Sequence, residues 1–131
     1  MELKDRKVVF SLLWIFAMFN YLYADVMTLM DPAMLNKIVT GTSVVKMTSG
    51  TLLAAAILME TAIVMVILSR LLKYRANRFA NITAGIIHTT AVFLSMFAGK
   101  PSLYYLFFGI IEIACTSFII WYAWTWPIIE A

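Results

Sequence analysis

The chain has 131 residues, of which 63% are hydrophobic and 13% charged, and its mean hydropathy is +0.91. Soluble domains carry about 45–50% apolar and about 25% charged residues, so this composition excludes an ordinary soluble fold. The net charge of +3 does not indicate nucleic acid as a partner, because the basic residues flank apolar runs, as in membrane proteins. The single cysteine, Cys115, excludes an internal disulfide, and the length predicts one domain, residues 1–131.

The first apolar run covers residues 8–27 and follows the basic residues Lys4, Arg6 and Lys7. This order resembles that of a secretory signal peptide. However, no small-residue cleavage site follows the run, which is free of charge until Asp25. We therefore expect this segment to be retained as a transmembrane helix.

The connection after the first run carries the sequence signals of a short helix. Asp31 is a suitable N-cap, Pro32 fits the first helical turn, and Gly41 suits the end of the helix. We therefore expect an extra helix over about residues 32–40, on the outer surface.

Three further apolar runs follow, at residues 47–68, 79–98 and 103–129. Each is long enough to cross a hydrocarbon core of about 30 Å, which takes roughly 20 helical residues. The four runs together predict an all-α integral membrane protein, a four-helix bundle whose principal partner is the lipid bilayer.

The connections and their basic residues predict the orientation of this bundle. The connections at residues 69–78 and 99–102 are short, which favours antiparallel neighbours. Only Lys37, Lys46 and Lys100 lie on one side, and the positive-inside rule therefore puts the other side, with both termini, in the cytoplasm. That richer side also holds four basic residues that we expect at anionic lipid headgroups: Arg70, Lys73, Arg75 and Arg78.

Three ionisable residues interrupt the later spans: Glu60, His88 and Glu112. A charged side chain at the bilayer centre costs about 2.5–3.5 kcal/mol on insertion scales, so such residues usually face the bundle interior and mark a site. At about 1.5 Å per helical residue, Glu60 lies roughly 18–20 Å below the outer boundary, His88 about 15 Å and Glu112 about 14 Å. This similar depth predicts one chamber where the second, third and fourth spans meet.

Polar and aromatic residues on other helix faces extend this candidate site. Trp14, Tyr21 and Asp25 follow one stripe along the first span, and Thr116 continues the polar stripe of the fourth. Trp14 and Tyr21 can offer aromatic faces to a cation. Asn20 and Asp25 lie nearer the outer side, where Asp25 is expected to line an entrance.

Four stretches of the sequence carry a resemblance: LWIFAMFNYLYADVMTLMDP, ILME, SRLLKYRANRFANI and IIEIACTSFIIWYAW. They resemble a family of small bacterial four-span membrane proteins that is catalogued as a domain of unknown function. The resemblance covers nearly the whole chain and implies a compact four-helix fold in a bacterial plasma membrane. It supplies no catalytic residue. DoxX-like proteins are similar only in general layout.

The preferred hypothesis is the binding or transport of a small cationic or amphipathic molecule. A carboxylate in a low-dielectric site favours its protonated form unless a cation compensates it, so proton and substrate compete. Glu60 and Glu112 would be the exchangeable carboxylates, tuned by His88. The small multidrug exporters are similar in size and in their use of a membrane glutamate, but theirs lies in the first span, where this chain has none. A through-pathway would favour a homodimer.

Two alternative functions stay open. An intramembrane enzyme could use the same groups for acid–base chemistry on a lipid or isoprenoid, as sterol isomerase-like membrane proteins do. A metal held by Glu60, His88 and Glu112 ranks below both readings, and no cofactor is expected. The last alternative is a structural or assembly subunit whose buried polar groups only fix the packing of its helices.

Overall fold

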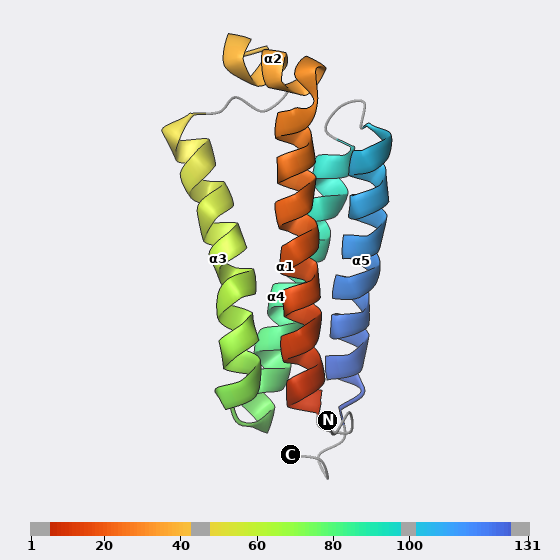
Figure 1. Ribbon diagram of the computed structural model, residues 1–131. Coiled ribbons are helices and arrows are strands. Elements are labelled where there is room, and N and C mark those ends of the chain that lie inside the picture. The colour runs from red at the N-terminus through yellow and green to blue at the C-terminus, as the bar shows by residue number, and fades with distance from the viewer. Residues whose placement is uncertain (1–5, 43–47, 98–101, 127–131) are drawn as a thin grey trace.

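The computed structural model of the chain describes residues 6–42, 48–97 and 102–126. The described residues are all-α and form five helices, α1 (Arg6–Met30), α2 (Pro32–Thr40), α3 (Ser49–Leu71), α4 (Tyr74–Met96) and α5 (Leu103–Trp124) (Figure 1). Four of them, α1, α3, α4 and α5, are long enough and apolar enough to cross a membrane. The prediction of four such helices and one short helix between the first two is confirmed.

The boundaries of the long helices differ by a few residues from those of the predicted apolar spans. The largest differences are of five residues: α4 begins at Tyr74, five before the predicted span at 79, and α5 ends at Trp124, five before the predicted end at 129. An apolar run marks the part of a helix that suits lipid, whereas the helix itself can extend through polar residues, as α4 does at Arg75 and Arg78. The predicted boundaries at residues 47, 98 and 129 lie outside the described residues.

The short helix α2 has the caps that the sequence predicts. The Asp31 carboxylate accepts a hydrogen bond from the Ala33 backbone N–H at 3.1 Å, and Pro32 occupies the first turn. Gly41 ends the helix with a φ of 73°, in the left-handed region that glycine adopts without steric cost. These local signals therefore suffice to place α2.

Hydrogen bonds between helix ends show which ends lie together. Arg6 of α1 donates to the carbonyl of Tyr122 at 2.8 Å, and Tyr74 of α4 donates to that of Trp126 at 2.6 Å. At the opposite end, the Tyr104 hydroxyl donates to the carboxylate of Asp31 at 3.0 Å. The start of α1, the start of α4 and the end of α5 therefore share one end of the bundle, away from α2 (Figure 1).

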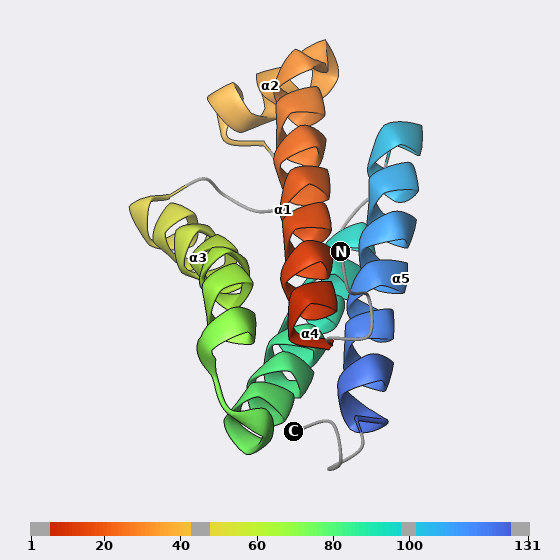
Figure 2. The same cartoon turned by 60° about the horizontal axis from the view of Figure 1, so that its bottom comes forward.

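Helix α1 lies at the centre of the arrangement and packs against both α3 and α5, while α4 packs mainly against α5. The interior between them includes the fully buried Phe10, Trp14, Ile119 and Ala123. In contrast, residues 52–57 of α3 are all exposed. Figures 1 and 2 show this end of α3 leaning away from α1.

Glycine allows α4 and α5 to approach closely. A Cβ atom on Gly85 would lie 2.7 Å from Cγ1 of Ile120, and one on Gly109 would lie 2.6 Å from the sulfur of Met96. Close packing of this kind at small residues is the usual way in which membrane helices associate.

Candidate functional site

Glu112 lies on the buried face of α5, and its side chain is only 5% exposed. Its main-chain carbonyl accepts a hydrogen bond from the Thr116 hydroxyl at 3.0 Å. Its carboxylate, in contrast, has no hydrogen-bond donor and no ion pair among residues 6–42, 48–97 and 102–126. Buried polar groups are almost always hydrogen-bonded, so this carboxylate needs a reason, as do the fully buried Tyr21 hydroxyl and Trp126 indole N–H, which also lack partners among the described residues.

Tyr21 of α1 faces the same region. Its hydroxyl is buried and finds no hydrogen-bond partner in the described part of the chain. Glu112 is close enough to interact electrostatically with this hydroxyl. Two neighbouring polar groups on α1 and α5 are therefore both left without a protein partner.

Two further residues lead from this region toward the α2 end of the bundle. Asp25 lies one turn beyond Tyr21 on α1 and is exposed. Tyr105 of α5 is half-buried, and its hydroxyl donates to that of Ser95 at 2.8 Å. Glu112 interacts electrostatically with both Asp25 and Tyr105. Asp25, Tyr105 and Glu112 therefore lie within electrostatic range of one another.

His88 of α4 is 1% exposed, and partners within the protein surround it. Its Nε2 lies 2.8 Å from the Thr61 hydroxyl, which itself donates to the carbonyl of Leu58 at 2.5 Å. Because a hydroxyl has one proton, Thr61 accepts from the His88 N–H. The imidazole also packs between the ring of Tyr21, stacked at 5.4 Å, and the edge of Trp14 at 5.3 Å.

Glu60 is not part of this cluster, which corrects the predicted chamber of three ionisable residues. Its side chain is exposed on α3, whereas the adjacent Thr61 faces His88. Successive helical residues point about 100° apart, so a similar depth does not bring two side chains to one place. Within the described ranges, no group of three or more His, Cys, Asp or Glu is placed to hold a metal ion.

The other predicted site residues have partners inside the protein. The Trp14 indole N–H donates to the Asn81 side chain at 2.8 Å, and the Thr116 hydroxyl lies 2.7 Å from that of Thr89. Asn20 is half-buried and donates to a carbonyl of its own helix at 2.9 Å. These hydrogen bonds join two helices or lie within one helix, and none of them involves the Glu112 carboxylate.

A buried amide network near the α3–α4 connection was not predicted. The Asn81 amide donates to the Asn77 side chain at 2.6 Å, and the Asn77 amide donates to the Ser69 carbonyl at 2.7 Å. All three residues are fully buried. The signal was present in the sequence, because Asn77 and Asn81 are four residues apart and so share one helix face.

Comparison with known proteins identifies the family. A family model described as "Family of unknown function (DUF6326)" matches residues 2–130. The chain belongs to this family. The resemblance to a family catalogued as a domain of unknown function is thereby confirmed. No curated protein and no solved structure matches the chain, so the arguments on function for this DUF6326 protein start from its own geometry.

Four of the ten basic residues of this DUF6326 chain lie where α3 ends and α4 begins. Arg70, Lys73 and Arg75 are exposed, and Arg78 is half-buried. Arg78 donates to the carbonyls of the last turn of α5, from Nε and Nη2, at 3.0 Å each. It differs from the other three because it joins α4 to α5.

Proposed function

We propose that this DUF6326 protein binds a small cationic or amphipathic molecule at Glu112 and exchanges it for a proton. The observation that supports this is the buried carboxylate without a partner. An ionised carboxylate out of water requires a compensating positive charge, so the group is either protonated or paired with a cation. Since the described residues offer no such cation, a ligand would supply it.

The surroundings of Glu112 suit an organic cation. The Tyr21 ring can attract positive charge to its face, and its free hydroxyl can hydrogen-bond to the ligand or to the carboxylate. His88 covers one face of this ring and so keeps it in place.

Entry from the α2 end is part of the proposal. Asp25 is exposed there and would attract a cation toward Tyr105 and then Glu112, because acidic groups along a low-dielectric route raise the local cation concentration. A proton released by Glu112 would leave by the same route. Binding the cation and losing the proton would then be one exchange.

The membrane setting of the proposal follows from the basic residues. The end that holds Arg70, Lys73, Arg75 and Arg78 would face the cytoplasm, together with both termini of the chain, in a bacterial plasma membrane. The α2 end, with Asp25, would then face outward. Transport across the whole membrane would involve a homodimer, because four helices offer little room for a closed pathway.

The alternative functions stay predictions. An enzyme would need His88 to reach a substrate, but its N–H is bound to Thr61 and its ring is enclosed. A purely structural role explains His88, Trp14 and Asn81, which all have partners. It does not explain Glu112.

The proposal can be tested with purified protein in a neutral detergent and the lipophilic cation tetraphenylphosphonium. We expect Glu112→Gln to weaken binding by about thirtyfold or more, because removing one partner of a buried charge pair costs about 2–5 kcal/mol. In unbuffered solution the wild type should release about one proton for each cation bound, and Glu112→Gln none.

Glu60→Gln is the matched control, since it removes the same charge from an exposed site on α3. It should keep the affinity and the proton release of the wild type. The proposal is wrong if the wild type binds no lipophilic cation, if Glu112→Gln binds as well as the wild type, or if both variants lose affinity equally.

A further inference from the structure

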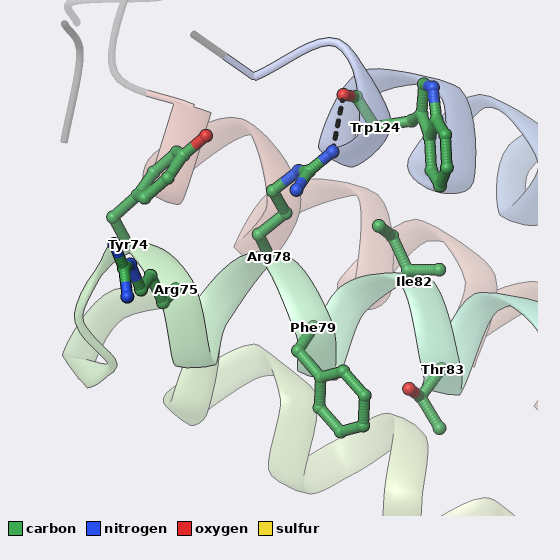
Figure 3. A pocket seen from close by; sticks show the side chains of 7 residues that line it. All are labelled: Tyr74, Arg75, Arg78, Phe79, Ile82, Thr83 and Trp124. Carbon is green, nitrogen blue, oxygen red and sulfur yellow. Dashed lines mark hydrogen bonds between the residues drawn. The ribbon is translucent and has the colours of Figure 1, made fainter. Parts of the chain in front are cut away.

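A cavity of about 470 Å³ lies between the first turns of α4 and the last turn of α5. Figure 3 shows the residues that line it, with Arg75 and Arg78 at the start of α4 and Phe79 and Ile82 beyond them along the helix. Trp124 borders the cavity from α5. The cavity therefore has a basic end and an apolar end.

The basic end offers hydrogen-bond donors that the protein does not use fully. Arg75 is exposed and makes no hydrogen bond or ion pair to another described residue. Arg78 bonds the carbonyls of Ala123 and Trp124 through two of its nitrogens, which fixes the guanidinium over the cavity. A guanidinium has five N–H donors, so Arg78 can still donate to an anion.

The apolar end suits a hydrocarbon chain. Phe79 is 72% exposed, and Trp124 is 67% exposed, although both lie on helices of membrane length. From Arg75 to Ile82 the helix rises about 10 Å, so the cavity changes from charged to apolar over the depth of one lipid headgroup region. Tyr74 and Trp124 add the aromatic rings that are typical of the membrane interface.

We infer that this cavity binds one anionic phospholipid of the membrane. Its phosphate would pair with Arg75 and Arg78, and one acyl chain would lie along Phe79 and Ile82. Charge complementarity selects an anionic headgroup, and the change from basic to apolar lining selects a lipid over free phosphate. The bound lipid would connect α4 to the last turn of α5.

The four basic residues at the α3–α4 connection do not all take part in the inferred lipid site, although the sequence predicts the same role for all four. Arg75 and Arg78 line the cavity, whereas Arg70 and Lys73 do not. It is also independent of the proposed function, because the cavity lies at the opposite end of the bundle from Asp25 and the route to Glu112. Either idea can fail without the other.

Native mass spectrometry of the purified protein tests it, with dioleoylphosphatidylglycerol and dioleoylphosphatidylcholine as the two probes. We expect the wild type to hold one phosphatidylglycerol about tenfold more tightly than phosphatidylcholine. Arg75→Gln should remove most of this tenfold preference, because the variant loses a charge-assisted hydrogen bond to the phosphate. Arg75 has no protein partner among the described residues, so this variant should fold normally.

Arg70→Gln is the control, since it removes the same charge at the same end but outside the cavity. It should retain the preference for phosphatidylglycerol. Millimolar inorganic phosphate should not displace the lipid. Equal binding of the two lipids, equal losses in Arg70→Gln and Arg75→Gln, or displacement by inorganic phosphate would each overturn the inference.

Discussion

The phenol ring of Tyr21 lies nearly flat against the imidazole of His88, with 5.4 Å between ring centroids and 18° between ring planes. The two stacked rings carry buried polar groups that differ in whether they have a hydrogen-bond partner. On the His88 side the N–H has its acceptor in Thr61, and on the other side the Tyr21 hydroxyl has no partner in the described residues. Packing thus accounts for His88, whereas the Tyr21 hydroxyl would find its partner only in the ligand of the proposed function.

Tyr21→Phe separates packing from binding at this contact. The variant keeps the stacked ring and removes a buried hydroxyl that has no partner, so we expect the free energy of unfolding to stay unchanged or to rise by about 1 kcal/mol. Cation affinity should fall severalfold if the hydroxyl contacts the ligand. Thermal unfolding and cation titration measure the two effects, and a clear loss of stability would show that the hydroxyl has a structural partner.

Trp14→Phe should destabilise the protein by about 1–3 kcal/mol. The reason is that the variant removes the indole N–H, which donates a hydrogen bond to the buried Asn81 side chain. The helical circular dichroism signal, followed during thermal unfolding, would show this. Trp121→Phe is the control, since Trp121 is 58% exposed. Equal melting temperatures for the two variants would contradict the importance of the Trp14 bond.

The two glycines between α4 and α5 should differ in their tolerance of alanine. Gly85→Ala places a methyl group 2.7 Å from the branched Ile120 and 3.4 Å from the Thr116 carbonyl, so we expect a cost of about 1–3 kcal/mol. Gly109→Ala meets mainly the flexible end of Met96, which can move. Thermal unfolding should rank Gly85→Ala clearly below Gly109→Ala, and the reverse order would count against this packing.

Glu60→Leu should keep cation affinity and should not lower the melting temperature. The reason is that Glu60 is exposed on α3, where an acid facing lipid is unfavourable and a leucine is not. Cation titration and thermal unfolding would compare Glu60→Leu with Glu112→Leu, which removes the other carboxylate in the same way. A loss of binding in Glu60→Leu would return Glu60 to the site.

The amino-acid sequence by itself determined the features that depend on local chemistry. Four apolar runs of membrane length predict four long helices, because lipid leaves the backbone no other partner than itself. Asp31, Pro32 and Gly41 predict α2, because a helix cap is made within a few residues of the chain. The family resemblance could also be recognised at this level, since it needs only the sequence.

Only the tertiary structure decided which polar side chains meet. Depth along a helix can be counted from the sequence, but direction around the helix depends on what packs against it. This is why Thr61, not Glu60, faces His88, and why Glu112 is buried beside Tyr21. A helix turns about 100° per residue, so one position along the chain separates a buried partner from an exposed one.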